Sequence, residues 1–440
     1  MNPATVSAGD TAWVLISTAL VMVMLPGLAF FYGGLVRSKG ALNTMMMSVA
    51  ALGVVGMQWV LFGYSLAFHP GSGLVGGLGW RGLVGVDGNP LPAYSATIPH
   101  LSYATYQAMF AAITVALVSG AVVERMRFRA YMLFVLLWTT IVYDPLAHWV
   151  WGDGGWLHTL GALDFAGGTV VHVSAGIAAL VAAYLTGSRH ELGRAPIVPH
   201  NVPFVLLGAG LLWFGWFGFN GGSALAANGL AAVAVTTTNS AAAAALVTWM
   251  VLDHLRTSRS TAVGAATGAV VGLVAITPAA GFVTPLAGLA IGVIAACCSY
   301  GAMQLRSRTA LDDSLDVFAC HGVGGIVGAL LTGVFASKAV NPAGADGWLA
   351  GNPHQMVVQL TAVGATVALS AVATTAIILF VRAVMGVRLR VEDEITGIDL
   401  AEHGEEAYYG GDVGELAGRR PLIGESVFVP AAEMRPRAAG

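Results

Sequence analysis

The sequence predicts an all-α protein that crosses a membrane many times. Hydrophobic residues make up 56% of the 440-residue chain and charged residues only 10%, and the mean hydropathy is +0.75. A soluble domain carries about 25% charged residues, so this chain could not build a water-facing surface without large apolar patches. Uncharged apolar runs of about 20 residues, the length of a membrane-spanning helix, recur along most of the sequence. Lysines and arginines gather in alternate connections between these runs, as they do in polytopic membrane proteins.

Eleven apolar runs are long enough to span a bilayer, and the eighth is the shortest. They are residues 11–35, 43–68, 102–123, 129–150, 166–187, 202–220, 228–252, 261–277, 283–305, 317–336 and 356–385. Residues 1–10 lack the basic residue and the small-residue cleavage site of a signal peptide. We therefore expect the first run to be retained as a membrane helix.

The basic residues also predict the orientation of the bundle, because lysine and arginine favour the cytoplasmic side. With the N-terminus outside, 18 of the 20 lysines and arginines lie in the cytoplasm, and Arg81 and Lys338 lie outside. An odd number of crossings then places the C-terminus in the cytoplasm. We call the two ends of the bundle the outer end and the inner end accordingly.

The chain divides into a transmembrane domain, residues 1–385, and a cytoplasmic C-terminal tail, residues 386–440. The tail is polar and opens with the acidic run Glu392-Asp393-Glu394, so we expect its first part to be ordered and its last part disordered. A net charge of −3 without a concentrated basic patch argues against a nucleic-acid partner. The three cysteines lie in apolar runs and fit neither a disulfide framework nor a zinc spacing.

Two short patterns occur twice, at corresponding places in two sets of five helices. The first is Phe31-Tyr32-Gly33-Gly34 and Phe219-Asn220-Gly221-Gly222; the second is His-x-x-x-Gly-Ile, at His172 and at His321. Because five is odd, two such units run in opposite directions through the membrane, which is the inverted repeat of many transporters. The sequence thus predicts an inverted five-helix repeat, helices 1–5 and 6–10, followed by a long eleventh helix. Chance similarity between glycine-rich helices is the alternative.

His172 and His321 are ionisable residues inside predicted spanning helices, and the repeated pattern places them at corresponding positions. Such groups are rare in a membrane and face the protein interior or a pathway. Two neutral imidazoles can share one N–H···N hydrogen bond and line a pore for a small molecule that both donates and accepts hydrogen bonds. They would solvate a bare metal cation poorly, because it needs a cage of oxygens. The alternatives are a histidine bonded within the bundle and a metal site, which lacks the expected carboxylate or thiolate ligands.

Aromatic residues collect where the helices reach the outer end. Tyr106 and Phe110 lie four residues apart on one helix face, Trp151 ends the fourth helix, and Trp216 and Phe219 end the sixth, just before Ser223. Aromatic faces attract a partly desolvated cation, and a serine oxygen can accept a hydrogen bond from an N–H group. Interfacial anchoring is the alternative interpretation of these residues.

The other polar residues receive simpler interpretations. Asp164, just before the fifth helix, is predicted to cap that helix and to bias the outer vestibule toward cations. Glu124 and Arg125 look like ordinary interfacial charges at an inner helix end. We expect solvated or structural roles for the remaining histidines: His69, His100, His148, His158, His190, His200, His254, His354 and His403. Neither a nucleophile–base constellation nor a cofactor motif is present, so we expect neither an enzyme nor a cofactor.

Long stretches of the sequence resemble the Amt/Mep/Rh family of ammonium transporters, over about residues 9–410. The stretches are Gly9-Asp10-Thr11-Ala12-Trp13, Leu25-Pro26-Gly27-Leu28-Ala29-Phe30-Phe31-Tyr32-Gly33-Gly34, residues 161–172 from Gly161 to His172, Gly218-Phe219-Asn220-Gly221-Gly222-Ser223, residues 321–326 from His321 to Ile326, and residues 397–405 from Gly397 to Glu405. Trp151 and the Gly9–Trp13 opening favour the Amt branch. Tyr106 is a departure, since members commonly carry phenylalanine there.

The resemblance implies an eleven-helix homotrimer in the plasma or inner cell membrane, with one ammonium pore per subunit lined by His172 and His321. It implies an outer ammonium site of Trp151, Ser223 and the aromatic ring of Tyr106, supported by Asp164, and a gate of Phe110 and Phe219 with Trp216 beside it. The tail resembles the segment that contacts PII-type signalling proteins. We expect NH4+ to bind outside and lose a proton and NH3 to cross, with the proton carried separately or returned. A passive NH3 or CO2 gas channel and an ammonium sensor are the alternatives.

Overall fold

The computed structural model describes residues 5–194 and 197–408, and all of their regular structure is helical. Ten of the described helical spans are long and apolar enough to cross a membrane, and the shorter helix α11 (Ala262–Ile276) lies where the eighth run was predicted. The prediction of an eleven-helix membrane protein is confirmed. The last part of the tail, for which disorder was predicted, lies outside the described residues.

The helices of the first half are α1 (Ala8–Leu35), α2 (Ala41–Gln58), α3 (Tyr64–Phe68), α4 (His100–Val118), α5 (Phe128–Trp138), α6 (Asp144–Trp151), α7 (Trp156–Leu160) and α8 (Ser174–Thr186). Those of the second half are α9 (Val202–Gly221), α10 (Gly229–Thr257), α11, α12 (Pro285–Arg306), α13 (Gly324–Phe335) and α14 (His354–Met385), and the tail adds α15 (Val391–Thr396) and α16 (Ile398–His403). Four π-helical segments interrupt the spans: η2 (Trp59–Gly63), η5 (Thr139–Tyr143), η6 (Gly168–Val173) and η8 (Phe318–Val323).

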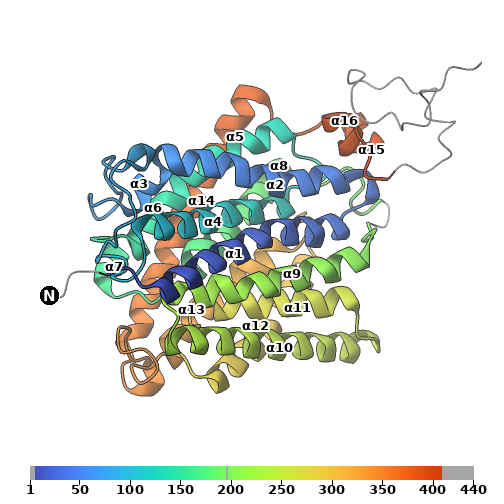
Figure 1. Ribbon diagram of the computed structural model, residues 1–440. Helices are drawn as coiled ribbons and strands as arrows, with labels where there is room; N and C mark the ends of the chain where they lie inside the picture. The colour runs from blue at the N-terminus through green and yellow to red at the C-terminus, as the bar shows by residue number, and fades with distance from the viewer. Residues whose placement is uncertain (1–4, 195–196, 409–440) are drawn as a thin grey trace, which may run out of the picture.

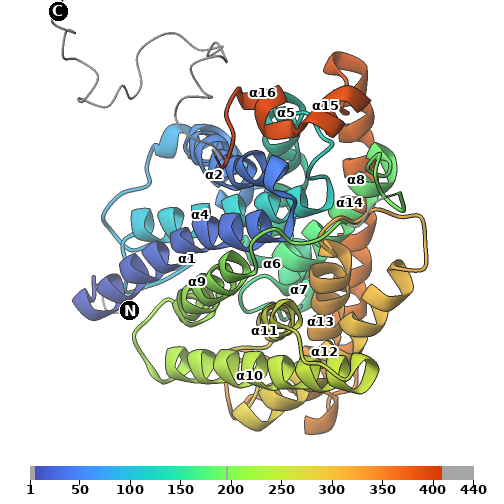
Figure 2. The ribbon, with the colours of Figure 1, turned by 90° about the vertical axis from the view of Figure 1, so that its right-hand side faces the viewer.

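The first helices of the two predicted repeat units, α1 and α9, lie side by side through the middle of the bundle (Figures 1 and 2). Glycine permits this approach, because a Cβ on Gly208 would lie 2.2 Å from the backbone nitrogen of Phe31. Around this pair, α2 packs against α4 and α5, as α10 packs against α11 and α12. The two halves of the chain therefore repeat one packing arrangement.

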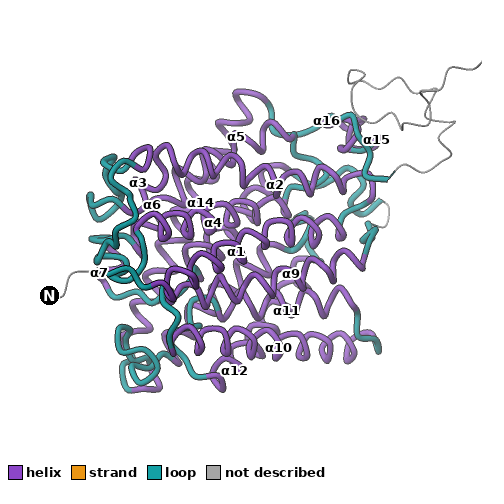
Figure 3. Tube along the Cα trace, in the orientation of Figure 1, coloured by secondary structure: helices purple, strands orange, loops and turns teal. Residues whose placement is uncertain are grey.

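Loops gather at both ends of the bundle, and the described part of the tail lies at the edge of one of them, next to helices of the first half (Figures 1 and 3). The tail is fixed by backbone and side-chain bonds. The Leu389 amide donates to the Arg125 carbonyl at 2.9 Å, and the Asp399 carboxylate accepts from the amides of Leu42 and Asn43 at 2.9 and 2.8 Å. Asp399 thus caps the start of α2. Residues 386–408 hold the inner ends of several helices together.

Candidate functional site: a histidine pair between two vestibules

His172 and His321 face each other in the centre of the bundle. Their Nδ1 atoms are 3.3 Å apart, their ring centroids 5.3 Å, and both side chains are at least 97% buried. Each lies in a six-residue π-helical segment, η6 or η8, a local geometry that is frequent at functional sites. The close Nδ1 atoms fit one shared N–H···N hydrogen bond between neutral rings.

An aspartate stands eight residues before each histidine and caps the segment that carries it. The carboxylate of Asp164 accepts the amides of Gly167, Gly168 and Thr169 at 2.8, 2.6 and 2.8 Å. The carboxylate of Asp313 accepts the amides of Val317 and Phe318 at 3.1 and 2.7 Å. Helix starts leave such donors unpaired, so both carboxylates fix the helix turns that position the histidines. Asp313 was not recognised from the sequence, although its spacing from His321 repeats that of Asp164.

The glycine of each His-x-x-x-Gly pattern packs against the histidine segment of the other repeat unit. A Cβ on Gly176 would lie 2.1 Å from the Gly322 nitrogen, and one on Gly325 would lie 3.0 Å from the His172 Cβ. The two segments cross at backbone contact, where only glycine fits. This crossing sets the separation of the two imidazoles.

A narrow apolar cavity runs past the histidine pair, with a volume of about 10 Å3, roughly enough for one water-sized molecule. Its lining residues are Met24, Leu28, Phe31, Tyr32, Ile113, Leu117, Val171, His172, Leu212, Trp216, Phe219, Val270 and His321. The Trp216 ring stacks on His172 with centroids 5.4 Å apart, and its indole N–H donates to the Thr277 hydroxyl at 2.9 Å. Apart from the two imidazoles and the Tyr32 hydroxyl, this passage is built of apolar side chains.

Two phenylalanine rings close the outer end of the passage. Phe219 lines the passage, Phe110 lines the larger outer vestibule, and the two rings stack with centroids 4.1 Å apart. At the other end, Phe31 lines both the passage and an inner vestibule of about 290 Å3. Phe31 and Phe219 are the first residues of the repeated Phe-x-Gly-Gly pattern, and a role for Phe31 was not predicted from the sequence.

The outer vestibule has a volume of about 220 Å3 and holds several of the predicted substrate residues. It is lined by Ala93, Tyr94, Tyr103, Gln107, Phe110, Trp151, His158, Phe165, Ser223 and Leu225. The Trp151 indole N–H donates to the Asp164 carbonyl at 2.9 Å, and the Ser223 hydroxyl donates to the Phe219 carbonyl at 2.8 Å. Phe110, Trp151 and Ser223 therefore lie together. Gln107 and His158 also line this space, although sequence reasoning gave them no role in it.

Tyr106 does not line this vestibule. Its ring meets that of Phe110 edge to face at 4.9 Å, as the four-residue spacing suggested, and its side chain is fully buried. Its hydroxyl points to the backbone of α9, 2.8 Å from the Gly218 carbonyl and 2.9 Å from that of Phe219, and lies 3.3 Å from the Ser223 hydroxyl. Tyr106 thus supports the vestibule wall from behind.

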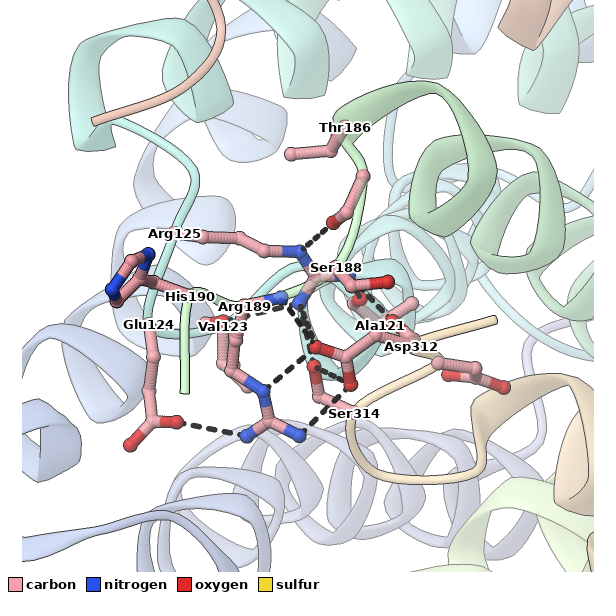
Figure 4. Close-up of polar contacts among 12 residues, drawn as sticks. Ala121, Val123, Glu124, Arg125, Thr186, Ser188, Arg189, His190, Asp312 and Ser314 are labelled. Carbon is pink, nitrogen blue, oxygen red and sulfur yellow. Dashed lines mark hydrogen bonds and ion pairs between the residues drawn. The ribbon is translucent and has the colours of Figure 1, made fainter. Parts of the chain in front are cut away.

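The interpretation of Glu124 and Arg125 as ordinary interfacial charges is wrong. Both are buried in an ionic cluster at the inner end with Arg189 and Asp312 (Figure 4). Arg189 donates to both carboxylate oxygens of Asp312 at 2.9 Å and to Glu124 at 2.8 Å. Arg125 donates to Ser314 at 2.6 Å and to the carbonyls of residues 121, 123, 187 and 312. The cluster joins the loops that follow α4 and α8 to the loop that precedes η8.

Ionisation of this cluster follows from its contacts. Burial raises the pKa of Asp312 and the arginines lower it, and the balance holds the pKa at about 2. Glu124 also has a lowered pKa, because its hydrogen bonds and ion pairs with Arg37 and Arg189 outweigh its burial. Asp313 lacks such a partner, so burial and the nearby Asp316 carboxylate raise its pKa to about 7. The lowered pKa values keep the two carboxylates of the cluster charged at neutral pH, whereas the pKa of Asp313 beside them is raised.

Two vestibules with a narrow, histidine-lined apolar cavity between them fit a membrane channel or transporter for a small molecule. The model of the Ammonium Transporter Family matches residues 12–408, and the chain belongs to this family. It is similar to the ammonium transporter of Bacillus subtilis, with 49% identity over 91% of this chain and 98% of the relative, and to Amt1 of Archaeoglobus fulgidus, with 46% identity over 91% and 100%.

Solved structures agree with this assignment. The crystal structure of Candida albicans Mep2 aligns with a TM-score of 0.85 and 40% identity over 95% of this chain and 94% of that one. Saccharomyces cerevisiae Mep2 aligns with a TM-score of 0.84 and 39% identity over 88% and 90%. A structure described as a sensor Amt protein aligns with a TM-score of 0.83 and 29% identity over 90% and 98%.

Proposed function

We propose that this protein takes ammonium from the outer vestibule, removes one proton and conducts NH3 through the histidine-lined passage. The observation that carries the proposal is the narrow passage itself. A buried charge in apolar surroundings is costly, so a passage walled by apolar groups and two imidazoles favours the neutral species. The two Nδ1 atoms, 3.3 Å apart, share one hydrogen bond, which leaves one Nε2 as an acceptor and the other as a donor. A neutral NH3 can donate to the first and accept from the second.

The outer vestibule supplies the binding step of the proposed cycle. NH4+ lies against the faces of Trp151 and Phe110 and donates one hydrogen bond to Ser223, whose own proton is directed to the Phe219 carbonyl at 2.8 Å. Aromatic faces stabilise a desolvated cation, and an oxygen that already donates its proton is left as an acceptor. Asp164, at 7% exposure, supports this region from the helix start behind it, and the Phe110–Phe219 pair opens as NH3 enters. The proton removed from NH4+ either returns to the outside or crosses separately along the two imidazoles.

The relatives are named as transporters, which fits a protein that is not an enzyme. We place the protein in the cell membrane as a homotrimer, each subunit with its own pore, as the family resemblance implies. The inner end and tail are the surface that we propose for a PII-type signalling protein. These assignments are checked by the mass of the purified protein in detergent and by pull-down with a PII protein.

The test is ammonium-evoked current in proteoliposomes that hold the purified full chain, with potassium as the control ion. A saturable current with ammonium, absent with potassium and lost in His172→Ala, supports proton-coupled transport through the histidine pair. The matched control is His254→Ala, because His254 is an exposed histidine on α10. Internal alkalinisation without current would instead identify a passive NH3 channel.

A second function, ammonium sensing, is favoured by the tail contacts and by the likeness to the sensor Amt protein. In that case a transport-dead variant such as His172→Ala would still recruit a partner to the inner end only when ammonium is present. Partner binding that does not depend on ammonium, or that is lost in the transport-dead variant, would contradict this function.

A further inference from the structure

We propose that Gln107 is a further substrate-binding residue of the outer vestibule, where its side-chain oxygen accepts a hydrogen bond from an N–H group of the bound cation. The inference rests on the proposed function and deepens it, because it explains how the site distinguishes ammonium from a cation of similar size that donates no hydrogen bonds.

Gln107 lies in the same wall as the predicted site residues. It is one residue after Tyr106 and three before Phe110 on α4, and it lines the outer vestibule with Trp151 and Ser223. Its side chain is only 8% exposed. An uncharged amide at this depth is costly unless its hydrogen bonds are made.

One half of the amide is held and the other half is free. The Nε2 group donates to the Tyr103 hydroxyl, one helical turn earlier, at 3.3 Å. The Tyr103 hydroxyl can accept or donate, so this contact is kept in either amide orientation, and a cation in the vestibule selects the one that presents Oε1, because the flipped amide would present N–H groups to a positive charge. Oε1 is buried and has no hydrogen-bond partner among the described residues. A buried acceptor without a partner costs free energy that a donor in the vestibule would recover.

The chemistry of the vestibule wall identifies the donor. Its charged or titratable lining groups are His158 and the hydroxyls of Tyr94 and Tyr103, so the wall holds no carboxylate to bind cations by charge alone. Tyr94 already donates to the Phe68 carbonyl. Ser223 and Gln107 remain as neutral oxygen acceptors beside the aromatic faces. Two neutral, directional acceptors favour a cation with several N–H groups over potassium, which needs a fuller cage of oxygens to replace its hydration shell.

The same arrangement predicts a graded response to methylation of the substrate. Ammonium carries four N–H groups and methylammonium three, so replacement of an N–H by a methyl group leaves fewer donors for the two oxygens and the aromatic faces. Loss of the Gln107 acceptor should therefore harm ammonium more than methylammonium and should leave potassium binding unchanged.

The experiment compares Gln107→Leu, which removes the acceptor, with Gln107→Glu, which keeps an oxygen at the same distance along the side chain. Both are reconstituted as full chains, and the concentration dependence of ammonium and methylammonium transport is measured with potassium as a competitor. Gln304→Leu is the matched control, since Gln304 lies in the last turns of α12, away from the vestibule lining. We expect Gln107→Leu to raise the KM for ammonium about tenfold or more, the usual effect of losing a hydrogen bond to a charged group.

The maximal rate should change less than the KM, and Gln107→Glu should keep a KM below that of the leucine variant. A KM within twofold of wild type in Gln107→Leu would overturn the inference. So would an equal loss for ammonium, methylammonium and potassium, since that pattern indicates a distorted vestibule. If wild-type protein itself shows no saturable ammonium transport, the proposed function fails first, and this inference fails with it.

Discussion

Substitutions in the ionic cluster at the inner end test how much its buried ion pairs contribute to the stability of the folded protein. Asp312 is fully buried and accepts the Arg189 Nε, Nη2 and backbone N–H at 2.9, 2.9 and 2.8 Å. Its pKa of about 2 lies below the ordinary 3.8, a lowering that corresponds to roughly 2 kcal/mol. Asp312→Asn leaves Arg189 with Glu124 and takes from the buried Arg125 the carboxylate it pairs with, and removal of one partner from a buried pair costs about 3–5 kcal/mol. We expect a loss in this range.

The sign of the pH dependence follows from the lowered pKa. A carboxyl whose pKa is lower in the folded state contributes stability above about pH 3.8, and this contribution is lost as the pH falls toward 2. Wild-type protein should therefore lose stability in that window and Asp312→Asn should lose less. The measurement is denaturant unfolding of the detergent-solubilised protein, followed by tryptophan fluorescence, at neutral and acidic pH.

A double substitution separates charge from packing in the same assay. Asp312→Leu with Arg189→Leu removes both charges, so it should be less destabilising than Asp312→Leu alone, which strands an arginine. Asp393→Asn is the control, because Asp393 pairs with an arginine that is 71% exposed and should change stability little. A cost below about 1 kcal/mol for Asp312→Asn, or strictly additive effects in the double variant, would refute the reasoning.

Three further predictions concern the neighbouring elements. Because the pKa of Asp313 is raised to about 7, its contribution to stability is present below about pH 3.8 and is lost as the pH rises through 7; Asp313→Asn should flatten the stability profile measured by unfolding between pH 5 and 8. Gly176→Ala places a Cβ 2.1 Å from the Gly322 backbone, so this variant should no longer elute as a single monodisperse peak in size-exclusion chromatography. Gly210→Ala has open space around its Cβ and should elute like the wild type. Phe219→Ala removes one ring of the stacked pair, and we expect it to admit water and to carry a potassium current that the wild type excludes. A variant without potassium current would contradict the proposed gating role of the pair.

The sequence predicted the features that depend on local pattern. Hydropathy predicted the spans, and the repeated His-x-x-x-Gly pattern selected the two histidines that meet in the centre. It did not predict the ionic cluster, because Glu124, Arg189 and Asp312 are 65 and 123 residues apart in sequence and meet only through the fold. Gln107 carried a usable signal, a polar amide inside a helix of apolar and aromatic residues, but the lack of a partner for its Oε1 among the described residues depends on the fold.

The two repeat units build the two halves of the passage with the same arrangement of residues. In each repeat unit an aspartate caps a π-helical segment, a histidine follows eight residues later, and a glycine four residues further on packs against the other unit's histidine segment. Phe219 and Phe31 then occupy the outer and inner ends of the same cavity. Each histidine segment lies in close contact with the glycine of the other unit, so the separation of the two imidazoles depends on how closely the units pack. We therefore expect a hydrated cation not to pass the histidines, and on the function proposed above cations are distinguished in the outer vestibule, before the Phe110–Phe219 pair.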